Sequence, residues 1–594
     1  MITRIHSIIL GAIATYGLTL PCATLSQAAA ADWAPTSTHA HPLERSNARI
    51  VSYMAVNESI PIVVALKIND RAGLLALVDS QLTPGNSHYR KWRPHEELMT
   101  TFAPTPAQVS TVTNFLTRMG FADVVVEEGG LTVRATGTAG VIRRSFNTEL
   151  AHVRTADGRD AIANTKDVQV PAALDGLVEA VLGLQTVDLP HVMTVQTIQP
   201  SNWPAIYDAT SLPTGSKTTV GVVTVGLMTQ TLADFASYQN ENSIAPLTPS
   251  VVYVGTGTQV EEYAEGEWDM DTQNILAMSG NALGGMILYA APSFSDADLT
   301  STYSRIESAN AAKVINVSLG ECEASAYSDG ALSADDAIFA LAVAQGQTFS
   351  VASGDRGSNQ CGSYGINGQI GETLGVSYPA SSPYVVAVGG TVLSTGSGAA
   401  SYVSEVAWGA SGGGPSAYEN QPLWQTGIVP GTKRGVPDLA FDADFNVTTS
   451  TGGVCSGYTT QCQTICTSTV TGCSNVQYYC TLLTGLSESN GCTGAVTLNG
   501  GTSLASPLFV GIWARMESGT NNTLGFPAPL IYRSASAHPE IFHDITVGSN
   551  SAYSAGTGWD YVTGFGSLDV AKAYPVLRAQ SLAWLPAVLS ILLQ

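Results

Sequence analysis

The chain has 594 residues, which is too many for a single hydrophobic core and predicts two or three domains. Hydrophobic residues make up 44% and charged residues only 12%, a composition that excludes an intrinsically disordered chain. The formal net charge of -22 disfavours nucleic acid and anionic membranes as partners, and such an excess of acidic groups is best tolerated in acidic surroundings.

The first 31 residues have the features of an export signal. Arg4 and His6 precede the apolar run 8–13, and small residues at 27–31 offer a cleavage site. We therefore expect a signal peptide at 1–31 and a protein secreted to the outside of the cell, the alternative being an ordinary buried helix. The apolar tail 581–594 is too short to span a bilayer.

The cysteines predict disulfide bonds. Of nine cysteines, Cys22 lies in the signal, and an even number remains in the exported chain. Cys322 and Cys361 are one possible pair. The others crowd into a Thr-, Ser- and Gly-rich insertion at 454–496, for which zinc binding is the alternative; it lacks both a Cys-x-x-Cys pair and a histidine. They are Cys455, Cys462, Cys466, Cys473, Cys480 and Cys492.

The N-terminal third predicts a compact α/β domain at 32–190. Residues 60–66 and 124–126 are typical of strands, and 106–120 has helical spacing of apolar residues. Polar, proline-containing sequence then predicts a linker, with the site of maturation, at 191–204.

Residues 205–580 predict a second, larger α/β domain. Continuous apolar strands alternate there with helical stretches, which favours a parallel sheet covered by helices on both faces. Functional residues are then expected at the carboxyl ends of the strands. The strand candidates are 219–226, 314–318, 348–352 and 385–388.

Ser503 is the first candidate for a catalytic residue. It follows two glycines and Thr502, and it precedes the apolar helical run 504–512. A helix N-terminus favours developing negative charge, so the serine could act as a nucleophile if a base takes its proton. By itself the pattern equally suits a serine that only caps the helix.

No histidine lies in the right part of the chain to be the base of a catalytic triad with the chain order Asp, His, Ser. None occurs between 192 and 537. An esterase order could use His538 or His543, but 501–505 lacks the second glycine of that nucleophile turn. The nine histidines are His6, His39, His41, His88, His95, His152, His191, His538 and His543.

Carboxyl groups are better candidates for the general base than the histidines are. Glu267 and Asp271 are four residues apart in a helical pattern, so both project from one face and can share a proton. Asp355 follows the strand 348–352, where a protonated acid could donate to an oxyanion. The alternatives are solvated surface acids for the pair and an ordinary turn for Asp355.

Taken together, these motifs resemble the sedolisins, the serine-carboxyl peptidases, and most closely their bacterial pseudomonalisin and kumamolisin types. The E-x-x-x-D pair, the Ser-Gly-Asp-x-Gly segment 353–357 and the Gly-Thr-Ser segment 501–503 occur in the family's order, and the resemblance extends over about 45–575. Further matching segments are 89–92, 102–104, 378–384, 388–391, 411–414 and 436–438.

The resemblance implies a fold and a set of roles. The fold is a subtilisin-like α/β fold preceded by a smaller α/β, ferredoxin-like activation domain that blocks the cleft as an intramolecular inhibitor and is removed in acid. Ser503 is then the nucleophile, Glu267 the base, Asp271 its tuning partner and Asp355 the oxyanion donor. The implied function is a self-processing, acid-active endopeptidase of polypeptide substrates, expected to be a monomer.

The resemblance also implies one structural calcium ion. Its ligands would be the carboxylates of Asp544 and Asp560 and the carbonyl oxygens of Ile545, Gly556 and Gly558, an all-oxygen set that suits calcium. Two alternatives to the peptidase stay open at this point: a secreted lipase or esterase, and a catalytically silent binding protein of the same fold.

Overall fold

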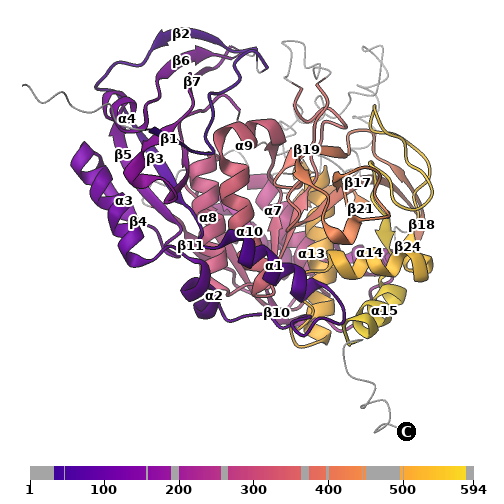
Figure 1. The fold of residues 1–594 in the computed structure, drawn as a ribbon. Coiled ribbons are helices and arrows are strands. Elements are labelled where there is room, and N and C mark those ends of the chain that lie inside the picture. Colours follow the sequence, from indigo (N-terminus) through magenta and orange to yellow (C-terminus); the bar gives the residue numbers. More distant parts are fainter. Residues whose placement is uncertain are drawn as a thin grey trace, which may run out of the picture. The chain divides into compact units, whose positions relative to one another are not determined.

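The computed structural model describes residues 33–45, 47–155, 158–188, 200–255, 265–362, 373–396, 401–443, 446–449, 496–499 and 501–582 (Figure 1). These residues belong to one compact unit, Trp33–Gln594. The predicted signal peptide lies outside them, as do residues 191–199 of the linker, the cysteine-rich insertion up to 495 and residues 583–594 of the tail.

A four-stranded antiparallel sheet organises the N-terminal region, residues 33–188. Its strand order is β4-β5-β3-β9. With helices between β3 and β4 and between β5 and β9, this is the ferredoxin-like arrangement, as predicted. The elements are β1 (Trp33–Pro35), β2 (Arg49–Tyr53), β3 (Ser59–Leu66), α1 (Arg71–Leu82), α2 (His95–Phe102), α3 (Pro106–Met119), β4 (Ala122–Val126), β5 (Thr132–Thr138), α4 (Ala139–Phe146), β6 (Leu150–Arg154), β7 (Asp160–Asn164), β8 (Gln169–Pro171) and β9 (Val178–Leu182).

Local sequence explains why α3 begins and ends where it does. The Thr105 hydroxyl accepts from the Gln108 amide while the Gln108 side chain accepts from the Thr105 amide, a complete capping box. The helix ends at Gly120, whose φ of 97° suits glycine. Its buried residues, Val112 and Leu116, pack into the core of this region.

A mostly parallel sheet of eight strands forms the centre of the C-terminal region, residues 200–582. The order is β11-β12-β10-β13-β15-β17-β18, β21 also pairs with β17, and only β17–β18 is antiparallel. The strands are β10 (Gly215–Val225), β11 (Ser250–Tyr253), β12 (Leu283–Ala291), β13 (Val314–Val317), β15 (Thr348–Ala352), β17 (Val386–Thr395), β18 (Tyr402–Ala407) and β21 (Leu439–Asp442). All four predicted strands are among them.

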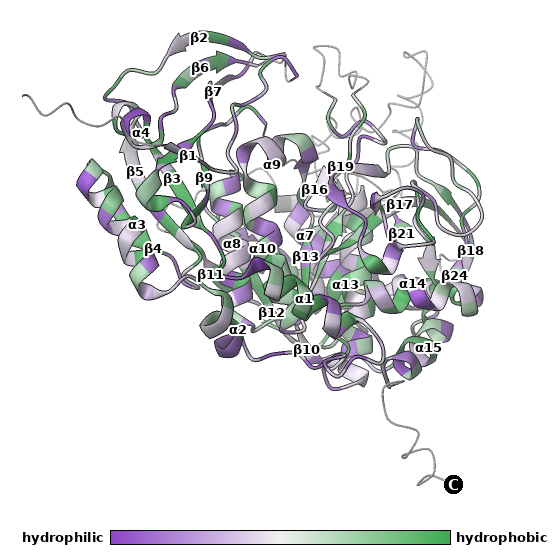
Figure 2. Ribbon diagram, in the orientation of Figure 1, coloured by the Kyte–Doolittle hydropathy of each residue, from purple (hydrophilic) through white to green (hydrophobic). Residues whose placement is uncertain are grey.

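Helices cover both faces of this sheet, as β15 shows. Neighbouring residues of a strand point to opposite faces. The ring of Phe349 contacts Phe339 in α10 (Ala331–Ala344), whereas the hydroxyl of Ser350 lies 2.8 Å from that of Ser506 in α13 (Thr502–Gly519). α10 is hydrophobic along most of its length, in keeping with its burial (Figure 2).

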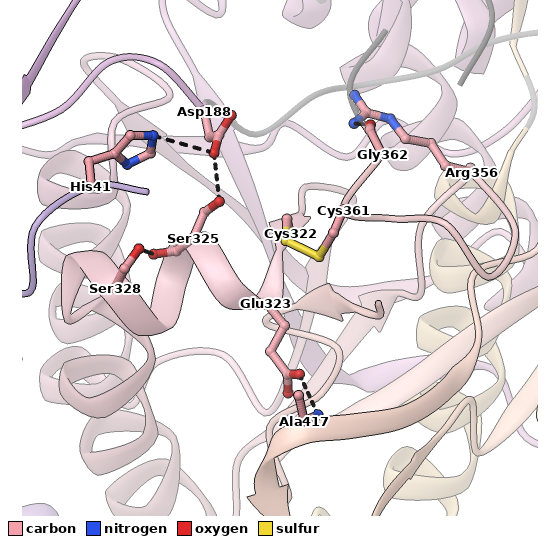
Figure 3. The surroundings of a disulfide bond; sticks show 10 residues. All are labelled: His41, Asp188, Cys322, Glu323, Ser325, Ser328, Arg356, Cys361, Gly362 and Ala417. Atoms are coloured by element: carbon pink, nitrogen blue, oxygen red, sulfur yellow. Dashed lines mark hydrogen bonds and ion pairs between the residues drawn. A yellow bond between two sulfur atoms is a disulfide. The ribbon is translucent and has the colours of Figure 1, made fainter. Parts of the chain in front are cut away.

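The remaining elements surround this sheet. The Cys322–Cys361 disulfide, predicted as one possible pair, joins the short strand β14 to the turn that contains Cys361 (Figure 3). Within the described ranges, no helix is both long and apolar enough to cross a bilayer. The elements are α5 (Trp203–Ile206), α6 (Thr229–Glu241), α7 (Glu265–Met278), α8 (Asp296–Ala309), β14 (Glu321–Cys322), α9 (Glu323–Asp329), β16 (Ser377–Tyr378), β19 (Gly414–Asn420), β20 (Lys433–Val436), β22 (Asn446–Thr449), β23 (Val496–Asn499), α14 (Ala528–Ala537), β24 (Phe542–His543), β25 (Ser567–Leu568) and α15 (Val570–Leu582).

Candidate active site

Helix α7 buries both members of the predicted carboxyl pair. Glu267 is 4% exposed and Asp271 is fully buried, so neither is a solvated surface acid. The Ser318 hydroxyl donates to Asp271 Oδ1 at 2.7 Å. One turn further along the same face of α7, the Trp203 indole donates to the side-chain oxygen of Asn274 at 2.7 Å, which ties this face of the helix to α5. The pair is therefore held rigidly inside the domain.

Burial raises the pKa of both carboxyl groups well above their ordinary values. For Glu267 the charge of Asp271 raises the pKa further, while hydrogen bonding to the Ser503 side chain opposes the rise. For Asp271, hydrogen bonds from Ser318 and Asn316 oppose the effect of burial on the pKa. Two such groups cannot both ionise cheaply, so the pair retains a proton in mildly acidic water.

Ser503 lies at the start of helix α13, directly opposite this pair. The helix begins at Thr502, and Gly501, at a φ of 88°, is the capping residue. Ser503 is therefore not the cap, and the capping alternative is wrong. Its Oγ lies 3.4 Å from the carbonyl oxygen of Ser318, and the hydroxyl oxygen of Ser318, whose proton is directed at Asp271, lies 3.3 Å from the carbonyl oxygen of Ser503. Ser318 thus links the serine to the pair on α7.

Asp355 lies on the other side of the same helix start. Its Oδ1 accepts from the Thr502 amide at 2.8 Å and from the Thr502 hydroxyl at 2.6 Å, and that hydroxyl accepts from the Gly354 amide at 3.1 Å. A Cβ atom at Gly501 would lie 2.1 Å from Asp355 Oδ2, so only glycine fits there. Asp355 is therefore bonded into the site and is more than a turn residue.

The bonding of Asp355 also determines where its proton can lie. Burial raises the pKa of Asp355 to about 6, although the hydrogen bonds from Thr502 act to lower it. Because Oδ1 already accepts two hydrogen bonds, the proton of the neutral acid belongs on Oδ2. In mildly acidic water Asp355 is thus a hydrogen-bond donor beside Ser503.

Sequence reasoning missed a chain of buried polar side chains beneath the site. Asn316 donates to Ser318 at 2.9 Å and accepts from Ser506 at 2.8 Å, and Ser506 continues to Ser350. All four side chains are at most 1% exposed. The available signal was a polar residue, Asn316, inside the otherwise apolar strand 314–317. Buried polar side chains are almost always hydrogen-bonded, so such a residue predicts polar partners nearby. This chain fixes the distance between α13 and Asp271.

Asp544 and Asp560, the two carboxylates among the predicted calcium ligands, both contact the segment 556–558. The Gly558 amide donates to both carboxylate oxygens of Asp544 at 3.1 Å, and the Gly556 amide donates to Asp560 Oδ2 at 2.9 Å. Two carboxylates therefore face one short segment that also carries two of the predicted carbonyl ligands. The donor set is all oxygen and fits calcium.

The N-terminal region is attached to the C-terminal region through an arm that includes Trp92. The Trp92 indole donates to the Thr523 carbonyl at 3.3 Å. A Cβ atom at Gly346 or Gly525 would lie 2.8 Å or 2.4 Å from the Trp92 ring, so the ring packs directly on those glycines. His95, nearby, lies 3.1 Å from the buried carboxylate of Glu307.

Comparison with known proteins agrees with this division of the chain. Residues 46–187 match the family described as "Pro-kumamolisin, activation domain", and residues 270–566 match the subtilase family. The chain is 38% identical to sedolisin of Pseudomonas sp. over 92% of each chain. It is 34% identical to xanthomonalisin of Xanthomonas sp., over 93% of this chain and 70% of that protein.

A solved structure of Pseudomonas sedolisin, a serine-carboxyl proteinase, is similar as well. It has a TM-score of 0.55 and 40% sequence identity, over 65% of this chain and 100% of that one. The predicted fold is thereby confirmed, and the esterase alternative is set aside. With an activation domain ahead of a subtilisin-like domain, the chain belongs to the sedolisin family of serine-carboxyl peptidases and is made as a zymogen.

Proposed function

We propose that this zymogen is secreted and matures in acid to an endopeptidase in which Ser503, Glu267, Asp271 and Asp355 carry the chemistry. One observation supports this most strongly. Two buried carboxyl groups on one helix meet a serine at the start of another helix, and the sequence between 192 and 537 contains no histidine. A carboxylate is then the base available to the serine.

The first step needs a nucleophile and a base. Ser503 Oγ attacks the scissile carbonyl carbon while its proton passes to Glu267. Asp271 keeps the second proton of the pair, so Glu267 can be ionised next to it without a second buried charge. The proton on Glu267 then passes to the amine as the carbon–nitrogen bond breaks, and water releases the acyl group by the reverse route.

Asp355 would stabilise the oxyanion. Oδ2, the oxygen that carries the proton, lies against Gly501 and is free of Thr502; from there it would donate to the carbonyl oxygen of a peptide bound at Ser503, where charge develops. A donor placed in advance at such a position typically accelerates acyl transfer by about 10²–10³-fold. Asp355 must therefore stay protonated while Glu267 is ionised, which restricts activity to acid.

The pH profile follows from this requirement. We expect acid maturation and peptidase activity to fall as the pH rises through about 6, where Asp355 loses its proton. The test incubates the purified precursor at about pH 4 and follows its mass and its cleavage of a denatured protein, and then measures kcat/KM against pH. A precursor that stays intact and inactive at every pH would refute the proposed function.

Asp355→Asn provides the matched variant. Its amide can accept from Thr502 through oxygen and donate through nitrogen without titrating. The high-pH fall should therefore move upward or disappear in Asp355→Asn, even if the maximal rate is lower. If Asp355→Asn still loses activity near pH 6, the titration of another group causes that loss.

A calcium ion at the 544–560 loop is the second part of the proposal. Asp544 and Asp560 with the carbonyls of Ile545, Gly556 and Gly558 would hold it, and its charge would stabilise a loop that otherwise gathers two carboxylates. We expect a chelator to lower the melting temperature by about 5 °C or more. Asp560→Asn should melt lower and no longer respond to the chelator. Equal melting curves with and without chelator would remove the site.

A further inference from the structure

Outside the catalytic group, three carboxyl groups form a second buried cluster, which we term the acid pocket: Asp296, Glu321 and Asp329. Each can offer an oxygen within 4.8 Å of the other two. They come from the first residue of α8, from β14 and from the end of α9, and their exposed fractions are 9%, 9% and 4%. Both oxygens of Asp329 lack a hydrogen-bond partner within the described residues.

The N-terminal region inserts a basic side chain into the acid pocket. His41 is 4% exposed, and its Nε2 lies 3.8 Å from Asp188 (Figure 3). Its Nδ1 lies 3.6 Å from Asp329. Neither ring nitrogen has a hydrogen-bond partner in the part of the chain that the structure describes. Burial acts to lower the pKa of His41, but Asp329, Asp188 and Asp296 raise it overall. A side chain that is cationic in acid therefore already contacts the pocket, at Asp329.

The acid pocket lies close to Ser503. Glu321 lies three residues after Ser318, and Ser318 contacts Ser503. Three residues span at most about 10 Å. Pairing of Glu321 with Tyr378 across β14 and β16, and the disulfide at Cys322, fix the position of this strand. A substrate bound at Ser503 can therefore place a nearby side chain in the pocket.

The path of the chain indicates which side of the scissile bond is involved. Asp188 is held at the pocket by the Ser325 hydroxyl, which donates to it at 2.6 Å, and by Gln185, whose amide donates to the Asp188 carbonyl at 3.0 Å (Figure 3). The linker proposed to be cut begins directly after it. Because Asp188 precedes the proposed cut in sequence, the pocket that it adjoins is assigned to a side chain N-terminal to the scissile bond.

The N-terminal region also covers the pocket. The amide of His39 donates to the Ser328 carbonyl at 2.5 Å, and a Cβ atom at Gly330 would lie 2.7 Å from Ala180. Removal of residues up to 188 would take away His41, Asp188 and this cover together. Three carboxyl groups would then lie together with no cation beside them, and groups buried in this way hold their protons unless a counter-charge binds.

We propose that in the mature enzyme the acid pocket binds a lysine or arginine side chain of the substrate on the N-terminal side of the scissile bond, and that His41 occupies its place in the precursor. The proposal rests on the proposed function, because it needs the N-terminal region to leave and a polypeptide to bind at Ser503. A side chain is favoured over a metal ion because the precursor already fills the pocket with one.

The test compares acetylated peptides that differ only by lysine or norleucine at each of the positions N-terminal to the cleaved bond. Acetylation removes the positive charge of the peptide N-terminus, so the lysine side chain is the only cation in the peptide. With mature enzyme at about pH 5 we expect kcat/KM to favour lysine by about 10-fold at one position. Asp329→Asn and Glu321→Gln should bring this ratio close to one, mainly by slowing the cleavage of the lysine peptides. Glu405→Gln, a buried carboxyl outside the pocket, is the control.

Two results would overturn the proposal: equal cleavage of lysine and norleucine peptides at every position, or a lysine preference that survives both pocket variants. Binding of the same peptides to Ser503→Ala protein, nicked within 189–199 by an added protease and freed of the N-terminal region, gives a readout without catalysis. If the wild type cleaves no peptide, the proposed function fails, and the binding ratio still decides for or against the acid pocket.

Discussion

Ser503→Ala should give a precursor that keeps its full mass in acid and cleaves no protein. The hydroxyl is the atom that would form the acyl bond, and no other serine occupies the start of α13 next to Glu267. Loss of a nucleophile of this kind lowers kcat by about 10⁴-fold or more. Mass spectrometry after incubation at about pH 4, with a fluorogenic protein substrate, measures both effects.

The control must show that the variant still folds. Ser534→Ala removes another fully buried serine, whose hydroxyl donates only to a carbonyl of its own helix α14, and it should mature like the wild type. Wild-type enzyme added in trans should cut the Ser503→Ala precursor at the normal site. Self-processing of Ser503→Ala at the wild-type rate would remove Ser503 from the mechanism.

Glu267→Gln should be almost as damaging, for a different reason. The amide has the size of the acid but cannot accept the serine proton, so the general base is lost while the packing of α7 is kept. We expect kcat to fall by about 10³-fold or more, with little change in KM for substrates that still bind. Single-turnover kinetics on trans-processed protein would separate the chemical step from binding.

Glu405→Gln is the matched control for this change as well. Glu405 is a buried acid of the same domain whose Oε1 accepts from Tyr207 at 2.9 Å and from Thr391 at 2.7 Å, and the glutamine oxygen can keep both bonds. Ser567, which donates to Oε2, can instead accept from the new amide. It should leave processing intact. If Glu267→Gln instead keeps most of its activity, the base is another group, and Asp271 would be the next to replace.

The central strands and the site residues could be predicted because their signals are local. Apolar runs such as 348–352 mark buried parallel strands, and two of them end beside polar residues, Ser318 after β13 and Ser353 after β15, which the parallel sheet brings to one edge. Glu267 and Asp271 needed only helical spacing. The Asp355 segment and the Ser503 helix start became interpretable once the lack of a histidine directed attention to carboxyl groups.

Other parts could not be predicted, because they depend on contacts between distant segments. Nothing local to Thr502 indicates that its hydroxyl bonds Asp355, and the roles of Asn316 and Ser506 appear only when β13 packs against α13. The acid pocket is the clearest case: its members come from three separate elements, and His41 reaches it from more than 250 residues away in sequence.

The contacts that form the candidate site join positions 47, 147 and 185 residues apart: Asp271 to Ser318, Asp355 to Thr502, and Ser318 to Ser503. No short piece of the chain contains a working subset. Such long-range contacts form late, when the sheet is complete. A nascent or unfolded chain therefore carries no hydrolytic hazard for the cell that makes it, quite apart from any inhibition by the N-terminal region, and the capacity to cut proteins arises only with the finished fold.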